Sequence, residues 1–385
     1  MKLSPPMQDI LLCLNKGKMR EIRCVLLVII AIGLCVWSGC SIHEPPAEVR
    51  TQTVEELSGS FSDISNGRLI LADDAESTVY YEAFLQNKTQ YSTEIFSDTL
   101  QRFDCITGDW HSLYQCPPKT TIIDSVMAED TILLMTVKGT YELHSPVLTR
   151  IDSEGNAHDF PLSVDFPLDG GAGFYKTDLV IWSRNGEVAR YSSDGSLISH
   201  VDLQPYIPMS AYMVDGAVSM VMFAINSQEQ AEFLVFSPDG ELVQNIPFAL
   251  NRRMYSYCYN DSGIYAVIAD NVADTTIGAA KKLIYIPFDA PEKEQSIKLP
   301  GEGIVYSNSK DILLRLTGTQ SDSGKLFVLD QNSFSLISVD TGILGKIRSS
   351  ATIVPADSGF YISAEWVSEA YDLEFATLYA EIYTP

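Results

Sequence analysis

The residues of this chain that could do chemistry are five histidines and a large surplus of carboxylates. No two of the histidines lie at metal-ligand spacing; they are His43, His111, His144, His158 and His200. The sequence has no Gly-x-Ser-x-Gly nucleophile motif, no Gly-x-Gly-x-x-Gly loop opening a helix, no P-loop and no His-Glu-x-x-His motif. We therefore expect no transition-metal site, and no catalytic residues of a familiar enzyme class can be assigned.

The carboxylates number 50 Asp+Glu against 26 Lys+Arg, which gives a formal charge of -24. In such an acidic chain a pair of neighbouring carboxylates is expected by chance, although such a pair could serve a lyase, lactonase or glycosidase. Calcium is the metal that the Asp-rich turns at Asp194, Asp239 and Asp261 would suit best. No Asp-x-Asp-x-Asp-Gly loop is present, so these residues are interpreted as turn formers and no cofactor is predicted.

The scarce basic residues give one candidate binding site. Arg252 and Arg253 directly precede Tyr255, Tyr257 and Tyr259, which alternate along one expected strand and would then share one side of it. A cationic, aromatic mouth of this kind would suit an anionic sugar, a peptide carboxylate or a wall polymer. In the alternative interpretation the tyrosines pack between neighbouring sheets and the arginines neutralise nearby carboxylates. The carboxylates considered for that pairing are Asp165 and Asp169.

The charge excludes some partners. Nucleic-acid binding draws its affinity from clustered Lys and Arg, and this chain lacks such clusters. Anionic membrane surfaces are disfavoured for the same reason. Membrane attachment, if present, must come from another source.

The N-terminal segment supplies that source. A basic stretch that includes Lys16 and Arg23 precedes an apolar run over residues 24–36, which is too short to span a bilayer and typical of a signal-peptide helix. The run ends in Trp37-Ser38-Gly39-Cys40, which resembles the bacterial lipobox, although Trp37 departs from the usual Leu, Val or Ile. The resemblance implies cleavage before Cys40 and diacylation of its thiol. In the alternative the segment is an uncleaved anchor and Cys40 an ordinary residue.

The chain therefore divides into a signal peptide at 1–39, a lipidated tether and closing strand at 40–57, and a folded domain at 58–385. Met19 would start a signal of conventional length, so residues 1–18 could be an over-long gene start. Residues 1–39 hold five basic and two acidic residues, so the mature chain has 21 Lys+Arg and 48 Asp+Glu, a formal charge of -27. Both interpretations of the N-terminus place the domain outside the cytoplasm. Cys105, Cys116 and Cys258 remain with Cys40, and a Cys105–Cys116 disulfide is one open alternative.

The folded domain repeats two kinds of hairpin. Seven hairpins have an apolar strand, a turn and a second strongly apolar strand. Their expected turns lie near Gly67, Asp130, Thr177, Gly216, Ser262, Lys310 and Ser358. Between them lie six hairpins with a polar second strand, such as YSSDGSLI and FSPDGELV, where Asp-Gly supplies the positive φ of the turn.

Alternation of the two series predicts an all-β domain, a single seven-bladed β-propeller with four antiparallel strands in each blade. The last blade has only three C-terminal strands, so a strand within residues 48–57 should complete it. The outer turns resemble those of propellers in the NHL, YVTN and TolB-like superfamilies. The architectural alternatives are an eight-bladed ring or two β-sandwiches.

The function expected from these features is that of a monomeric, lipid-anchored binding or scaffold propeller on the extracytoplasmic face of the cell membrane. Its partner would be a protein or an envelope glycan. The alternative is an extracytoplasmic enzyme that uses carboxylates in the central funnel. Fold alone does not decide between them.

Overall fold

The computed structural model describes residues 48–383, except for 54–58, 61–65, 74–77, 85–97, 105, 108, 139–143, 250, 271–280, 309, 318–323, 340–349, 357–358 and 368–372. One compact unit spans Glu48–Tyr383. The predicted signal peptide, Cys40 and the part of the predicted tether before Glu48 lie outside the described residues. Within the described part no helix is long and apolar enough to span a membrane.

Seven antiparallel sheets make up this unit, and each is a blade. Blade 1 holds β3 (Asn66–Asp73), β4 (Thr78–Phe84), β5 (Asp98–Asp104) and β6 (Trp110–Gln115). Blade 2 holds β7 (Thr120–Ala128), β8 (Thr131–Lys138), β9 (His144–Asp152) and β10 (Ala157–Pro161). Blade 3 holds β11 (Gly171–Tyr175), β12 (Asp178–Trp182), β13 (Glu187–Tyr191) and β14 (Leu197–Asp202). Blade 4 holds β15 (Ile207–Met213), β16 (Met220–Ile225), β17 (Ala231–Phe236) and β18 (Leu242–Phe248).

The remaining blades follow the same order. Blade 5 holds β19 (Arg253–Asn260), β20 (Gly263–Ala269), β21 (Lys281–Pro287) and β22 (Gln295–Leu299), with a single 3₁₀ turn, η1 (Pro291–Lys293). Blade 6 holds β23 (Glu302–Ser307), β24 (Ile312–Thr317), β25 (Leu326–Asp330) and β26 (Ser335–Val339). Blade 7 holds β27 (Ser350–Pro355), β28 (Gly359–Val367), β29 (Leu373–Tyr383) and β1 (Glu48–Thr53), with β2 (Gly59–Ser60) also paired to β29.

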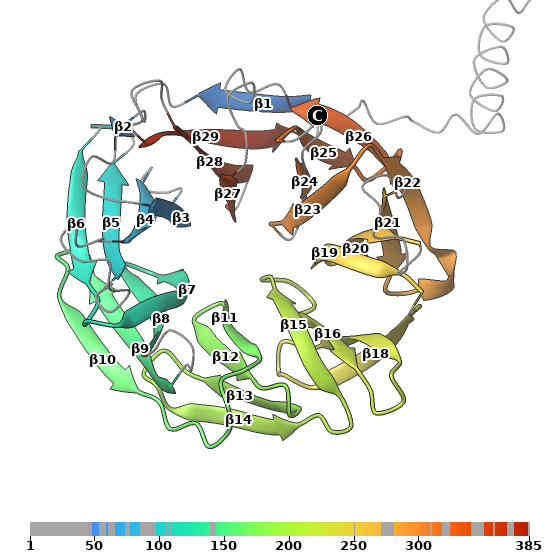
Figure 1. Ribbon diagram of the computed structural model, residues 1–385, viewed down its shortest axis with the longest axis horizontal. Coiled ribbons are helices and arrows are strands. Elements are labelled where there is room, and N and C mark those ends of the chain that lie inside the picture. Colours follow the sequence, from blue (N-terminus) through green and yellow to red (C-terminus); the bar gives the residue numbers. More distant parts are fainter. Residues whose placement is uncertain are drawn as a thin grey trace, which may run out of the picture. The chain divides into compact units, whose positions relative to one another are not determined.

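The blades follow one another around a ring, with the first strand of each innermost (Figure 1). The innermost strands of successive blades contact one another all the way round, from β3 to β7 and on to β27, which returns to β3. The predicted closure is confirmed, because β1 pairs antiparallel with β29, placing Glu48 opposite Tyr383. Pairing the two ends of the domain in one sheet leaves the ring without a seam between first and last blade.

One hairpin boundary was wrong. The first inner turn was expected near Gly67, but Gly67 lies inside β3, and the first inner hairpin joins β3 to β4. The Asn-Gly pair that suggested a turn stands at the start of a strand. The other six expected inner turns fall between the first and second strands of blades 2 to 7.

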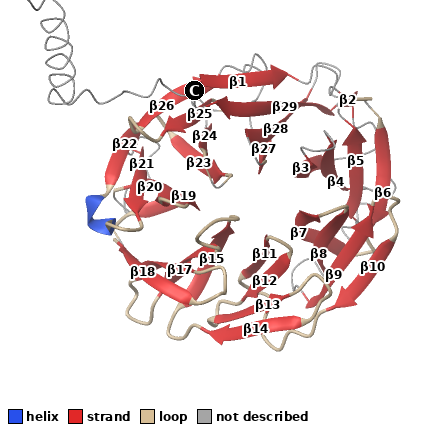
Figure 2. Ribbon diagram, turned by 180° about the vertical axis from the view of Figure 1, so that it is seen from behind, coloured by secondary structure: helices blue, strands red, loops and turns tan. Residues whose placement is uncertain are grey.

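Buried side chains explain the two kinds of hairpin. Seven apolar clusters lie among the described residues, and each fills the space between two consecutive blades. Middle strands are covered on both faces and read as unbroken apolar runs; every residue of β20 is buried. Outermost strands face water, and five of the six residues of β14 are exposed. They line the rim of the ring (Figure 2).

The outer turns also lock neighbouring blades. Gly155, Gly195 and Gly240 adopt φ of +86°, +78° and +83° in the turns of blades 2, 3 and 4. A Cβ added at Gly195 would lie 2.8 Å from Phe160 Cβ of blade 2, and one at Gly155 would lie 2.6 Å from the Leu113 carbonyl oxygen of blade 1. Glycine is therefore needed at these two turns both for the backbone conformation and for the close approach to the preceding blade.

Candidate functional site

The predicted site begins in the connection between β18 and β19, and a β-bulge in β19 divides it. Met254 pairs with Ile268 and Ser256 with Val267, so Tyr255 is the extra residue. The bulge reverses the alternation expected from the sequence. Tyr257 packs with the cluster between blades 4 and 5, whereas Tyr255 packs with the cluster between blades 5 and 6. The prediction that the three tyrosines share one side of the strand was therefore wrong for Tyr255, whereas Tyr257 and Tyr259 do share a side.

Tyr257 and Tyr259 connect blade 5 to blade 4. The Tyr257 hydroxyl donates to the Ser210 and Val221 carbonyl oxygens over 2.9 and 3.1 Å. The Tyr259 hydroxyl accepts the Val214 N–H at 2.9 Å. Burial raises the pKa of both phenols well above the ordinary value. These two side chains pack between blades, as the alternative interpretation proposed.

Tyr212 makes the next connection along the ring. Its ring lies 6.0 Å from that of Tyr259, and its hydroxyl accepts the Ser307 N–H of blade 6 at 3.0 Å. Burial raises its pKa strongly as well. Three tyrosines thus tie blades 4, 5 and 6 together around the centre of the ring.

Arg252 is held away from the innermost strands. Its guanidinium forms two hydrogen bonds with the Glu294 carboxylate, at 2.5 and 2.9 Å. Glu294 directly precedes β22, the outermost strand of blade 5. This partner is not one of the aspartates considered from the sequence. The bond to Glu294 raises the pKa of Arg252.

Arg253 and Tyr255 instead meet a lysine that sequence reasoning missed. The Arg253 guanidinium lies 5.1 Å and the Lys281 ammonium 4.4 Å from the centre of the Tyr255 ring. Lys281 is only 5% exposed, donates to the Tyr255 hydroxyl and pairs with Glu302 at 3.5 Å. The side chains of Arg253, Tyr255 and Lys281 form a cationic cluster at the start of β19, and of the residues predicted for the site only Arg253 and Tyr255 belong to it.

The centre of the ring holds a cavity of about 640 Å³. Its walls are both polar and apolar, and polar side chains of blades 1, 4 and 6 contribute to them; these include Asp73, Asp215, Ser307, Asn308 and Lys310. Asp215 pairs with Lys176 at 3.2 Å. An adjoining cavity of about 430 Å³ includes Asp124, which accepts the Phe174 N–H at 3.0 Å. Within the described ranges no three His, Cys, Asp or Glu side chains gather as a metal site would require.

The rim of blades 3 and 4 carries an unusual surface. Eight large apolar side chains are exposed in the described part of the chain, and seven of them belong to these two blades. Five lie on the outermost strands β14 and β18; they are Leu197, Ile198, Val201, Leu242 and Val243, here called the rim patch. Ile198 and Val243 are 52% and 58% exposed, and each is the extra residue of a β-bulge.

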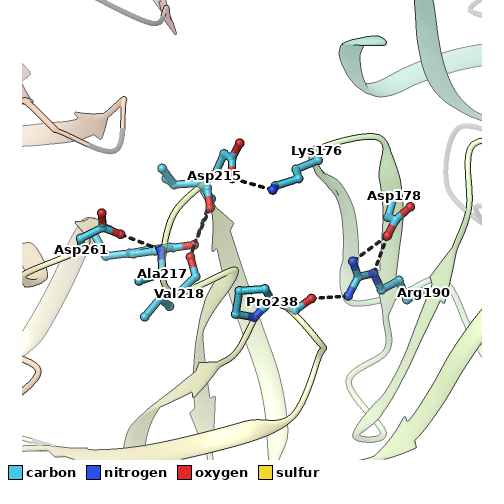
Figure 3. Close-up of polar contacts among 10 residues, drawn as sticks. Lys176, Asp178, Arg190, Asp215, Ala217, Val218, Pro238 and Asp261 are labelled. Carbon is cyan, nitrogen blue, oxygen red and sulfur yellow. Dashed lines mark hydrogen bonds and ion pairs between the residues drawn. The ribbon is translucent and has the colours of Figure 1, made fainter. Parts of the chain in front are cut away.

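The two blades are braced beneath this patch. Arg190 of β13 pairs with Asp178 of β12 at 2.6 Å and donates to the Pro238 carbonyl oxygen of blade 4 at 2.7 Å (Figure 3). Lys176 and Asp215 make a second bridge between the same blades, also drawn in Figure 3. A small cavity of about 30 Å³ lies between the two blades, and its lining includes Val201 of β14 and Gly240 beside β18. Val201 of the rim patch and Arg190 therefore line the same gap between blades 3 and 4.

The sequence contained a signal for this patch. The outer hairpins of blades 3 and 4 read SDGSLI and PDGELV, so a Leu-Ile and a Leu-Val pair follow the same turn. Adjacent apolar residues on a strand with one exposed face cannot both be buried. The spacing of the tyrosines led us to predict the site at β19 instead.

Two of the cysteines are located. Cys116 and Cys258 are buried free thiols, so Cys116 is not in a disulfide with Cys105, which lies outside the described residues. Burial raises the pKa of Cys116 to about 12, and that of Cys258 is also raised. Such thiols are protected from reaction while the domain is folded.

Comparison with known proteins supports the fold alone. No family model and no curated protein sequence matches this chain. An oligogalacturonate lyase from Vibrio parahaemolyticus has a similar structure, with a TM-score of 0.52 and 11% identity over 88% of this chain and 97% of that one. A chain of a mitotic checkpoint complex has a TM-score of 0.51 and 10% identity over 86% of this chain and 94% of that one. Hydrazine synthase from Kuenenia stuttgartiensis has a TM-score of 0.50 and 10% identity over 78% of this chain and 93% of that one. The chain is a β-propeller.

Proposed function

We propose that this chain is a lipid-anchored bacterial propeller, exposed outside the cytoplasm, that binds a partner protein through the rim patch without transforming it. We also propose that the chain is related to the NHL, YVTN and TolB-like propellers, whose outer turns its own resemble. The anchor rests on the apolar run at 24–36 and on Cys40. Binding rests on a single observation, the concentration of exposed apolar side chains on β14 and β18.

That observation favours a protein partner because single scattered apolar residues are ordinary on a surface, whereas several on the outermost strands of two successive blades are typical of an interaction surface. Exposed carboxylates of Asp194, Asp202, Asp239 and Glu241 border the patch. An apolar centre with a charged border is the usual arrangement of a protein interface. The Arg190 contact and the buried cluster between blades 3 and 4 hold both blades in place, so binding requires little rearrangement.

The test is a pull-down of the anchored protein from its own cells, in which the variant Leu197→Ser/Val243→Ser is compared with wild type. Ile106→Ser is the matched control, because Ile106 is 76% exposed in the outer turn of blade 1, away from the patch. We expect a partner that wild type and the control retain and the double variant loses. Equal recovery by all three would overturn the proposal.

The anchor is tested separately by Cys40→Ala. Diacylation needs the thiol, so this variant should leave the membrane fraction for the soluble extracytoplasmic fraction while folding normally. Membrane retention of Cys40→Ala would contradict the lipid anchor.

A second candidate function is an enzyme that uses carboxylates of the central cavity. Polar side chains from three blades, including Asp73 and Asp215, line that cavity. The likeness to a lyase adds nothing here, because at 11% identity it shows the fold alone. Turnover of an envelope polysaccharide by wild type that Asp215→Asn abolishes and Leu197→Ser leaves unchanged would favour this candidate over binding.

An envelope glycan is the other binding partner to consider, and the cationic cluster is the observation that favours it. Arg253 is exposed beside the Tyr255 ring and supplies a positive charge for an anionic sugar, whereas Lys281 is buried and paired with Glu302. Arg253→Gln should weaken binding of such a glycan, whereas Arg252→Gln, which breaks only the pair with Glu294, should not. Unchanged binding in both variants would exclude the cluster.

A further inference from the structure

The outermost strand of blade 3 has an open backbone edge. Among the described strands, β13 alone pairs with β14. Leu203 donates its N–H to the Gly186 carbonyl oxygen at 2.7 Å, which continues the β13–β14 ladder beyond Asp202. Since backbone groups alternate in direction along an antiparallel strand, those of His200 and Asp202 point away from β13. These groups form a short template for another strand.

Other outermost strands are protected and β14 is not. β10 ends in Pro161, β18 contains Pro247, β22 contains Lys298 and β1 contains Arg50, residue types that block or repel an added strand. β6 and β26 lack them, but none of their large apolar side chains is exposed. β14 combines an edge free of Pro, Lys and Arg with three exposed apolar side chains. Natural proteins leave such an edge open where something covers it.

Resting on the function proposed above, we infer that the edge of β14 accepts an extended segment of the partner protein as a fifth strand of blade 3. The segment lies beside Ser199–Asp202, where β14 is regular, because the bulge at Ile198 ends regular pairing there. An apolar side chain of the segment contacts Val201 on the face of blade 3 towards blade 4, because the bulge at Ile198 puts Leu197 on the opposite face. Main-chain hydrogen bonds to His200 and Asp202 fix its register.

The charge around this edge selects the chemistry of the segment. Asp194 precedes β14, Asp202 ends it, and Asp239 and Glu241 lie in the adjoining turn of blade 4; all four side chains are exposed. The guanidinium of Arg190 is already engaged by Asp178 and Pro238. A segment of alternating apolar and basic residues is complementary to this surface. A second copy of the chain is not, because each mature chain carries a formal charge of -27.

The test uses purified protein and a synthetic peptide of alternating valine and lysine. Binding is measured by fluorescence anisotropy for wild type, His200→Pro and His200→Ala. Proline removes the outward N–H and adds a steric block without taking a hydrogen bond from β13. His200→Ala is the matched control, because both variants lose the stacking on Phe166 and the contact with Glu187. We expect His200→Pro to bind the peptide about tenfold more weakly than His200→Ala, or worse.

Amide hydrogen exchange of wild type gives a second readout that needs no folded variant. The peptide should slow exchange at His200 and Asp202 and leave Ser307, on the far side of the ring, unchanged. A peptide with glutamate in place of lysine should bind at least about tenfold more weakly, because it meets like charge. Absence of peptide binding, equal binding by His200→Pro and His200→Ala, or unchanged exchange at His200 would overturn strand addition. Equal or tighter binding of the glutamate peptide would overturn the basic segment.

Sedimentation of the protein without peptide tests whether a second copy of the chain occupies the edge of β14. A wild-type dimer that His200→Pro converts to a monomer would assign the edge to a second copy and overturn the inference. Failure of strand addition is distinguishable from failure of the proposed function. In the first case the Leu197→Ser/Val243→Ser variant still loses its partner in the pull-down; in the second it retains that partner.

Discussion

Blade 4 packs a buried apolar cluster against each of its two neighbours, but the two junctions differ in what surrounds that cluster. Towards blade 5 it is closed by Tyr257 and Tyr259, whose rings are buried and whose hydroxyls bond to its backbone. Towards blade 3 it is braced by Arg190, while the outer strands of both blades leave apolar side chains in water. The buried clusters of both junctions stabilise the ring, whereas the exposed apolar side chains of β14 and β18 contribute little to folding. The difference indicates which surface is free to bind.

The largest expected effect comes from opening the tyrosine junction. Tyr259→Ala should lower the free energy of unfolding by about 4 kcal/mol, because it removes a fully packed aromatic ring and leaves the Val214 N–H without its partner. Tyr259→Phe keeps the ring and should cost only about 1 to 2 kcal/mol. Urea unfolding measures both. A loss below about 0.5 kcal/mol for Tyr259→Ala would show that this junction does not hold the ring together.

The next largest loss of stability is expected in the outer turn of blade 3, and the outer turn of blade 4 is its comparison. Gly195→Ala should cost about 2 kcal/mol, because φ is positive and the new Cβ would meet Phe160 at 2.8 Å. Gly240→Ala has the same backbone strain, but its nearest neighbour is Arg190 Nη1 at 3.8 Å, so about 1 kcal/mol is expected. The pair is compared by thermal unfolding. Equal losses of stability would mean that the close approach of Gly195 to blade 2 adds nothing to the cost of the substitution.

The smallest expected effect on stability is at the rim. Leu197→Ser/Val243→Ser should change the free energy of unfolding by less than about 0.5 kcal/mol, since both side chains are already exposed. Urea unfolding of this variant beside the Ile106→Ser control measures it. A loss comparable to that of Tyr259→Ala would mean that the patch is part of the core, and the contrast between the two junctions would fail.

The repeat of the fold was readable from the sequence, and much of the site was not. Apolar runs such as β20 and the Asp-Gly turns at Gly195 and Gly240 revealed the blades, because two-sided burial and positive φ leave clear residue patterns. The closing strand followed from counting strands. The Asn66-Gly67 pair led us to expect a turn where β3 begins, because the same pair can form a turn or begin a strand.

The site depends on features that no local pattern encodes. The bulge at Tyr255 reverses which residues share a side of β19, and a shift of one residue in pairing changes every later side-chain direction. Lys281 joins Tyr255 from another strand of the same sheet, 26 positions away. The pairing of Arg252 with Glu294 likewise depends on how β22 is placed.

A photo-crosslinking amino acid at position 243 of the anchored protein tests the central claim most directly. Irradiation of cells carrying it in place of Val243 should yield one saturable adduct with a partner protein, absent when the same group replaces Ile106. That adduct should also disappear when Leu197→Ser is added, since the change removes a neighbouring contact of the same surface. Identical adducts from positions 243 and 106, or none from position 243, would contradict the assignment of the rim patch as the binding surface.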